Sequence, residues 1–238
     1  MKARPILFSA PMVRALLDGR KTQTRRVVKP QPHHGPVGQI VNLGGAEWAM
    51  DDGDLSGLWT CPYGAPGDLL WVRETIQRFD KGTCDQNVWY RAGGNGGLDE
   101  HGVWNIPDGV DPHQPWPVDR KGPGGGAAYN VASIHMPRWA SRLTLEITDV
   151  RVERLPAISR ADAIAEGLQR LPASGRWVVE KGQQYAGLAD HDPRLVYSWL
   201  WEAINGPGSW ATNPWVWALT FKVHRANVDA VLNARAAA

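Results

Sequence analysis

The sequence predicts an α+β fold in which a small β-barrel carries flanking helices and long loop insertions rich in glycine and proline. Segments with the period-two alternation of strands outnumber segments with helical periodicity. The 26 glycines and 18 prolines gather mostly in the connections between these segments. Strands with few helices, joined mainly by non-local connections, favour a small β-barrel that carries loop insertions.

The first predicted elements are a strand, a helix and a second strand. The segment 5–9 has strand character. Ser9 suits a helix N-cap, Pro11 suits a first turn, and Gly19 suits the position just past a helix end. The segment TQTRRVV at 22–28 again has strand character, and prolines follow it.

The later elements follow the same logic. Strands are predicted at 69–73, just after a Gly-Asp turn, and at 143–152, where a shift in the apolar alternation indicates a bulge or bend. The sequence SRAD resembles a capping box that opens a helix over 159–168, and Asp-Pro opens another over 192–204. The alternation of apolar and polar residues at 215–224 predicts the last strand.

Two stretches interrupt this pattern. Residues 33–60 are rich in glycine and weakly periodic, and residues 91–126 hold ten glycines and five prolines in 36 positions. Such compositions are typical of loops. We therefore expect one domain over 1–225, with insertions at about 33–60 and 77–137, and a frayed tail at 226–238.

The near-neutral net charge of +2 hides an uneven distribution. The first thirty residues hold eight basic residues and one acidic residue, a formal charge of +7, and the remaining chain carries −5. This distribution favours a local site for an anionic or electron-rich partner. The 13 tryptophans beside three phenylalanines suit both cores and base-stacking surfaces.

Several classes of protein are not expected. No apolar run approaches the roughly 18–20 residues that a membrane helix needs. The charges of Arg14, Asp18 and Arg20 interrupt the N-terminal segment, so a secretory signal is not expected. Cys61 and Cys84 form neither a disulfide framework nor a metal-binding pair at CxxC spacing. These features favour the cytoplasm.

The segment GRKTQTRR at 19–26 is the strongest chemical signal in the sequence. If a strand follows the glycine turn, Lys21 can reach towards the hydroxyl of Thr24. Like charges disfavour a protonated lysine, and three of them are close in sequence: Arg20, Arg25 and Arg26. A lysine with a lowered pKa beside a threonine hydroxyl is a plausible nucleophilic pair. The alternative is a solvated basic turn that binds phosphate or nothing.

Several motifs together resemble the ASCH domain. They are GxK followed by TxR at 19–26, GDLLWV at 67–72, a strand leading into a helix at 143–168, and a last aromatic strand that ends in TFK at 220–222. That family belongs to the PUA-like superfamily of small β-barrels, which are associated with RNA and modified bases. The resemblance therefore implies a PUA-like barrel over about half of the chain.

One branch of the family adds an expectation of activity. The usual motif has Glu where this chain has Thr24, and a branch with Thr there comprises compact bacterial amidohydrolases that remove acyl groups from N4 of cytidine. The resemblance implies that Lys21, Thr24 and Glu166, the last on the helix after 158, are the working residues. The segments at 4–26 and 133–142 are also similar to longer ASCH proteins of phages and prophages.

The residues alone leave the role of Glu166 open. Asp162 and Glu166 lie at i,i+4 spacing on one helix face. That face is either an exposed acidic stripe or one side of a site, where Glu166 could pair with Lys21 or protonate a leaving amine.

Other candidates are weaker. Arg73 and Glu74 follow the strand at 69–73, and they either line the same pocket as Lys21 or form an internal salt bridge. Trp139, between Arg138 and Arg142, is either a base-stacking platform or part of the core. The seven histidines show no metal-ligand spacing, so we expect no metal or other cofactor.

The predicted function is hydrolysis of an N4-acylated cytosine nucleoside. Lys21 would activate Thr24 or water, Arg20 and Arg26 would contact the substrate or the oxyanion, and Glu166 would position Lys21. The alternatives are a non-catalytic reader of RNA or modified bases and a ribonuclease. The expected partners are a small nucleoside and RNA or modified nucleic acid, and no membrane.

Overall fold

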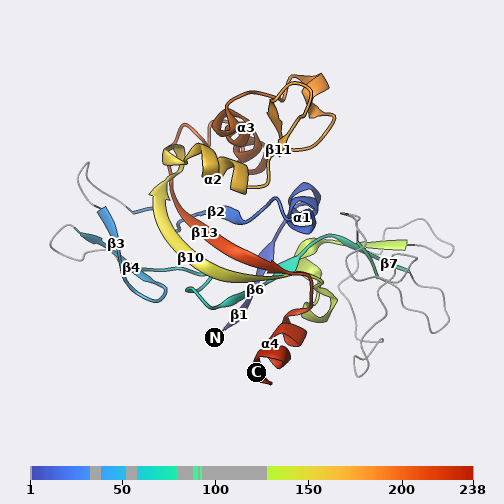
Figure 1. Cartoon of the computed structure of the whole chain (residues 1–238). Helices are drawn as coiled ribbons and strands as arrows, with labels where there is room; N and C mark the ends of the chain where they lie inside the picture. The colour runs from blue at the N-terminus through green and yellow to red at the C-terminus, as the bar shows by residue number, and fades with distance from the viewer. Residues whose placement is uncertain are drawn as a thin grey trace. The chain divides into compact units, whose positions relative to one another are not determined.

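The computed structural model describes residues 2–32, 39–51, 58–79, 88–90, 92 and 128–237. Helices and strands are mixed, which confirms the α+β class (Figure 1). The chain forms two compact units, each assembled from three separate segments. Unit 1 comprises 1–2, 18–68 and 146–222, and unit 2 comprises 3–17, 69–145 and 223–238. The expected single domain over 1–225 stays a prediction.

The longest run of strand pairing follows the order β1-β6-β10-β13-β2, in which β10 and β13 contribute residues to both units. β1 (Ala3–Leu7) and β6 (Leu69–Arg73) pair in parallel, and β2 (Gln23–Val27) pairs antiparallel with β13 (Trp215–His224). Among the described residues this order is linear and does not close on itself. The closed PUA-like barrel therefore stays a prediction.

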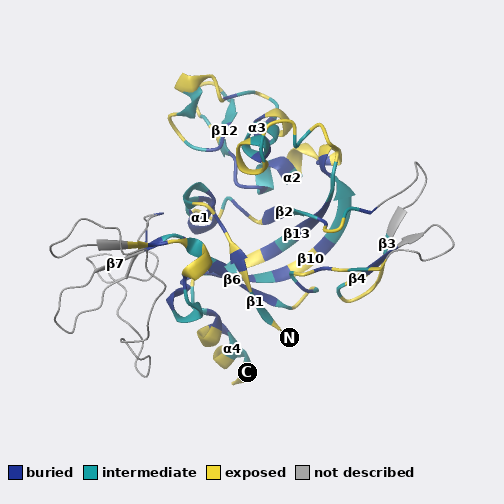
Figure 2. Ribbon diagram, turned by 180° about the vertical axis from the view of Figure 1, so that it is seen from behind, coloured by how far each residue is buried: buried dark blue, intermediate teal, exposed yellow. Residues whose placement is uncertain are grey.

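In unit 1, β13 is the central strand. Four consecutive residues, Val216 to Leu219, are buried, so both faces of the strand are covered there. Figure 2 shows this run of buried residues along β13. Leu219 is the residue paired with Thr24. The position of Thr24 thus follows from pairing with a strand that the alternation of the sequence identifies correctly.

Two helices of unit 1 form at the capping signals read in the sequence. α2 (Arg160–Ala165) begins after Ser159, whose hydroxyl accepts a hydrogen bond from the Asp162 backbone N–H. α3 (Pro193–Asn205) begins after Asp192, whose carboxylate accepts from the Arg194 N–H. The two helices lie side by side (Figure 1).

The insertion expected at 33–60 is more ordered than a loop. Its described part is an antiparallel three-stranded sheet: β3 (Gln39–Gly44), β4 (Glu47–Asp51) and β5 (Leu58–Thr60). Gly44 and Gly45 adopt positive φ in the β3–β4 turn, which explains why glycine is needed there. Trp48 packs edge-on against Trp217 with ring centroids 5.9 Å apart.

The remaining elements of unit 1 are short. They are β10 (Thr144–Arg154) from residue 146 onward, η3 (Leu155–Ala157), β11 (Gln169–Arg170), β12 (Trp177–Val178) and η4 (Gln183–Ala186). β10 begins one residue after the start of the strand expected at 143–152 and ends two residues beyond its end.

Unit 2 holds α1 (Ala10–Leu17), which follows β1 in the chain, and a second three-stranded sheet. That sheet comprises β7 (Ile76–Phe79), β8 (Val88–Tyr90) and β9 (Ala128–Val131), and two short helices follow, η1 (Ser133–His135) and η2 (Arg138–Ala140). The loop expected at 91–126 lies outside the described residues, apart from Ala92.

The C-terminal segment differs from the frayed tail expected at 226–238. It forms α4 (Val228–Ala236), because Asn227 caps the helix by accepting from the Asp229 N–H and because Val228 and Val231 are buried against Leu69 and Trp71. The sequence predicts a frayed tail because the segment is rich in alanine, and Val228 and Val231 alone give no clear helical periodicity. In the described part of the chain, no helix is long and apolar enough to cross a bilayer.

Candidate functional site

The segment around Lys21 is tied by its backbone to the end of α2. Lys21 forms an isolated antiparallel bridge with Glu166, and the Thr22 N–H donates to the Ala165 carbonyl over 2.9 Å. Glu166 is the C-cap residue of α2, and Gly167 follows it with a positive φ. These contacts bring the basic segment and the helix end together, although 144 residues separate them in the chain.

Glu166 is enclosed by three donors. Lys21 Nζ lies 2.7 Å from Glu166 Oε2 and also donates to the Glu166 carbonyl over 2.8 Å. Arg25 Nη1 lies 3.0 Å from Glu166 Oε1. The Tyr197 hydroxyl, from α3, donates to the same carboxylate. Lys21 is 1% exposed and Glu166 is 2% exposed, so water does not compensate these charges. The predicted pairing of Lys21 with Glu166 is present.

Arg25 links this pair to two further carboxylates. Its Nε donates to Glu153 Oε1 over 2.9 Å, and its Nη2 lies 2.7 Å from Glu153 Oε1 and 3.3 Å from Asp162 Oδ2. Gln23 Nε2 donates to the other oxygen of Asp162 over 2.8 Å. The Lys21–Glu166 cluster, as we call it, therefore sets Lys21 and Arg25 against three carboxylates. Arg151 supplies a third cation, with Nη1 3.5 Å from Glu153 Oε2 and Nη2 3.4 Å from Asp162 Oδ2.

The pKa of Lys21 is lowered, as the sequence suggested, but the main cause is different. Burial of the ammonium group is the largest effect, the Glu166 carboxylate opposes it, and the positive charges of Arg26 and Arg25 add to it. Arg20 plays another role, because it pairs with Asp18 at 2.9 Å and donates to the Gly167 carbonyl. Burial, more than repulsion, favours a neutral amine.

Thr24 is 1% exposed and lies next to this cluster in sequence. Side chains alternate along β2, so Thr24 shares a face with Arg26, whereas Arg25 shares the opposite face with Gln23. Arg26 donates to the Arg25 carbonyl over 3.2 Å and hydrogen-bonds to Tyr63. Among the described contacts, Lys21 Nζ reaches Glu166 and not the Thr24 hydroxyl. The Lys21–Thr24 pair thus stays a prediction.

The second set of candidates belongs to unit 2. Glu74 forms a bidentate salt bridge with Arg142, with Oε1 2.8 Å from Nε and Oε2 2.9 Å from Nη2, and both residues are buried. The Arg142 guanidinium lies 4.0 Å above the Tyr90 ring. Burial raises the pKa of Glu74, and Arg142 opposes that rise. Glu74 thus makes an internal salt bridge, and Arg142 is its partner.

Arg73 and Trp139 are also engaged in unit 2. Arg73 donates to the Ile134 carbonyl and stacks on Trp71, with its Cζ 5.3 Å from the ring centroid. Trp139 packs against the buried apolar cluster that includes Ile76 and Met136. These contacts favour the packing interpretation of Trp139. A pocket that joins these residues to Lys21 stays a prediction.

Sequence reasoning missed several members of both clusters. Arg142 and Glu153 lack a motif that would reveal them. Tyr197 lies on a helix whose apolar pattern suggested only core packing. The role of Arg25 could have been predicted. The strand alternation places its side chain on the face opposite Thr24, and Asp162 and Glu166, at i,i+4 spacing on one helix face, are two carboxylates with which it can pair.

Within the described ranges, no group of three or more His, Cys, Asp or Glu side chains is arranged to hold a metal ion. Comparison of the chain with protein-family models, with curated proteins and with solved structures finds no match.

Proposed function

We propose that this protein is an amidohydrolase of the ASCH type, with a PUA-like barrel, that removes acyl groups from the N4 amine of cytosine nucleosides. One observation carries the proposal: Lys21 is a buried lysine with a lowered pKa whose Nζ is held 2.7 Å from Glu166. A buried lysine that can become neutral is suited to accept a proton from a hydroxyl group. The motif resemblance supplies the substrate class.

The proposed reaction begins when neutral Lys21 takes the proton of the Thr24 hydroxyl. Thr24 Oγ1 then attacks the acyl carbonyl, and a tetrahedral oxyanion forms near Arg26 or a backbone N–H. The C–N bond breaks, and the exocyclic amine leaves with the proton that Lys21 received. Water attacks the acyl-threonine ester and releases the carboxylic acid. Glu166 positions Lys21 throughout.

The proposed reaction requires a movement of Lys21 and access of the substrate to buried side chains. Lys21 Nζ must turn from Glu166 to Thr24, and Glu166 can tolerate this because Arg25 and Tyr197 also donate to it. Substrate must also reach side chains that are 1–2% exposed, so the protein must open around β2.

The test is loss of the ultraviolet absorption of N4-acetylcytidine. Lys21→Met and Thr24→Val should each lower kcat/KM by at least 100-fold. The matched controls make the same chemical changes on β13: Lys222→Met at an exposed position and Thr220→Val beside Gln23. Both controls should stay within about threefold of wild type. No turnover by the wild-type chain, or full turnover by Thr24→Val, rejects the proposal.

The two other functions are outcomes of parallel assays. A reader would bind RNA with an affinity that falls steeply with salt, and a ribonuclease would shorten RNA in a manner that depends on Lys21. The internal pairing of Lys21 and Arg25 with carboxylates weighs against both, since neither charge faces a phosphate backbone. The amidohydrolase therefore comes first.

A further inference from the structure

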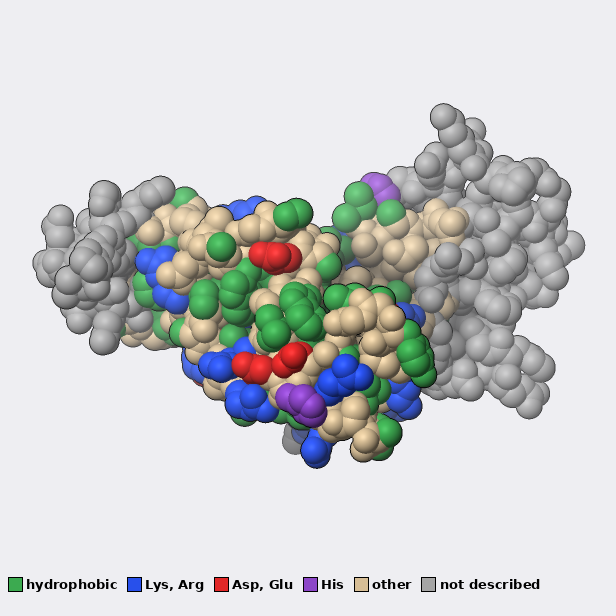
Figure 3. Space-filling model, turned by 90° about the horizontal axis from the view of Figure 1, so that it is seen from above, with side chains coloured by type: hydrophobic (Ala, Val, Ile, Leu, Met, Phe, Trp, Pro, Cys, Tyr) green, Lys and Arg blue, Asp and Glu red, His purple; other side chains and the backbone are tan. Residues whose placement is uncertain are grey.

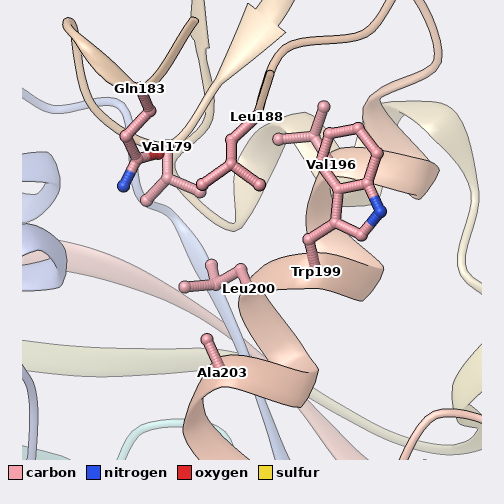
Figure 4. A pocket seen from close by; sticks show the side chains of 7 residues that line it. All are labelled: Val179, Gln183, Leu188, Val196, Trp199, Leu200 and Ala203. Atoms are coloured by element: carbon pink, nitrogen blue, oxygen red, sulfur yellow. The ribbon is translucent and has the colours of Figure 1, made fainter. Parts of the chain in front are cut away.

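Unit 1 contains a pocket that the proposed function does not use. It lies between α3 and the segment that carries η4, and its volume is about 160 Å³. The lining residues are Val179, Gln183, Leu188, Val196, Trp199, Leu200 and Ala203 (Figure 4). Val179 and Val196 are buried, whereas Leu188 is 42% exposed. The pocket therefore has a closed apolar base and an accessible rim.

The pocket is framed by ordered backbone. The Leu188 N–H donates to the Gln183 carbonyl over 3.1 Å, so the η4 turn closes on itself. At the base of this segment, Trp177 and Asp190 exchange backbone hydrogen bonds of 2.7 and 3.2 Å. Gly182 and Gly187 take the positive φ values that bound the turn. These hydrogen bonds define the backbone on the η4 side of the pocket.

The lining selects an uncharged ligand. Six of the seven side chains are apolar, and none is charged. Gln183 is the exception, and Figure 4 shows its amide at one end of the pocket. Its Oε1 accepts from the Glu180 N–H over 3.3 Å. The Nε2 group must turn towards the cavity to donate to a ligand. One polar contact beside six apolar ones fits a ligand with a single acceptor.

The size selects a single ring. An apolar cavity of about 150 Å³ admits benzene, whereas drug-sized ligands fill about 300–1,000 Å³. Trp199 adds an aromatic wall against which a ring can pack. A nucleobase fits poorly, because the lining offers its several donors and acceptors only the Gln183 amide and the Trp199 indole N–H. On the face of the molecule seen in Figure 3, apolar side chains gather close to acidic and basic ones.

We propose that this pocket is a binding site for an uncharged ligand the size of one aromatic ring, with one hydrogen-bond acceptor that receives the Gln183 amide. The site stands apart from the proposed amidohydrolase reaction. Val196 lines the pocket and Tyr197 donates to Glu166, and these successive residues of α3 project about 100° apart. The pocket lining and the Lys21–Glu166 cluster share no residue. Its occupation can therefore be tested without any turnover assay.

The experiment titrates the full-length protein with phenol and with benzene, followed by ligand-observed NMR and calorimetry. Both rings should bind, and phenol should bind about fivefold to tenfold more tightly. Gln183→Leu should remove that preference and leave benzene binding intact. Ala203 is an exposed lining residue, so Ala203→Trp should cover the accessible rim of the cavity and lower the affinity for both rings at least tenfold.

The matched control is Ile204→Trp, which adds the same indole at the next position of α3, where Ile204 is 59% exposed and does not line the pocket. It should bind both rings as wild type does. Thermal unfolding establishes that each variant is folded. Failure of the folded wild-type chain to bind either ring at about 10 mM overturns the proposal. Equal binding by Ala203→Trp and wild type overturns it as well.

Discussion

The Lys21–Glu166 cluster of unit 1 and the Glu74–Arg142 pair of unit 2 are both buried, but they differ in how many partners each charge has. Glu166 receives Lys21, Arg25 and Tyr197, whereas Glu74 is clamped by one bidentate arginine. Arginine stays protonated, while a buried lysine can lose its proton. Lys21 in the first cluster can thus lose its proton and change partners, whereas the Glu74–Arg142 pair is suited to a structural role.

We expect the largest effect from breaking the Glu74–Arg142 salt bridge of unit 2. Arg142→Met leaves the Glu74 carboxylate buried without its partner, which should cost about 3–5 kcal/mol in the free energy of unfolding. Arg25→Met should cost less, because Glu166 keeps Lys21, and Glu153 and Asp162, each with 18% of the side chain exposed, can be hydrated. Urea unfolding of both variants measures the difference. An equal or larger loss for Arg25→Met would contradict this comparison.

The next effect is on activity. Glu166→Gln keeps the shape of the side chain but weakens its hold on Lys21, so kcat/KM for N4-acetylcytidine should fall by about 100-fold. If Glu166 acts through Lys21, the double variant Lys21→Met with Glu166→Gln should be no slower than Lys21→Met alone. Additive losses would show instead that Glu166 has a separate role. Steady-state kinetics on the three variants decides between these outcomes.

A smaller effect is expected from the third donor to Glu166. Tyr197→Phe removes the hydroxyl and keeps the ring, which packs against Trp201 and Trp210 at centroid distances of 6.4 and 6.1 Å. Loss of one hydrogen bond to a charged group should lower the free energy of unfolding by about 1.5–3 kcal/mol. Tyr90→Phe is the matched control in unit 2, because the hydroxyl of Tyr90 donates to a neutral carbonyl, that of Ala140, over 2.8 Å. It should cost only about 0.5–1.5 kcal/mol.

The contrast between the clusters also shows which features could be predicted from sequence. Local signals identified the strands at 69–73 and 215–224 and the caps Ser159 and Asp192. The resemblance of motifs, and not the local pattern, pointed to Glu166 as a partner of Lys21. Each of these depends on alternation, capping chemistry or a motif. The partners Arg142 and Tyr197 depend on tertiary packing, which leaves no periodic trace. The strands within 33–60 are not predicted, because glycine-rich turns weaken the alternation of apolar and polar residues in this segment.

The smallest effect is a difference in pH dependence between the two regions. Lys21 has a lowered pKa in the folded chain, so between that value and about 10.5 the unfolded chain binds more protons, and stability rises with pH. Glu74 has a raised pKa, so between about 4.5 and that value the folded chain binds more protons, and stability falls as pH rises.

Urea unfolding across pH separates these two contributions when each variant is compared with wild type. The free energy of unfolding of wild type, measured relative to that of Lys21→Met, should increase as the pH rises towards about 10.5. Measured relative to that of Glu74→Gln, it should decrease as the pH rises above about 4.5. Lys222→Met provides the exposed-lysine control on β13. If the free energy of unfolding of wild type falls with pH relative to that of Lys21→Met, the Glu166 carboxylate raises the pKa of Lys21 more than burial lowers it. In that case Lys21 would be a fixed structural cation like Arg142, and the distinction between the two clusters would fail.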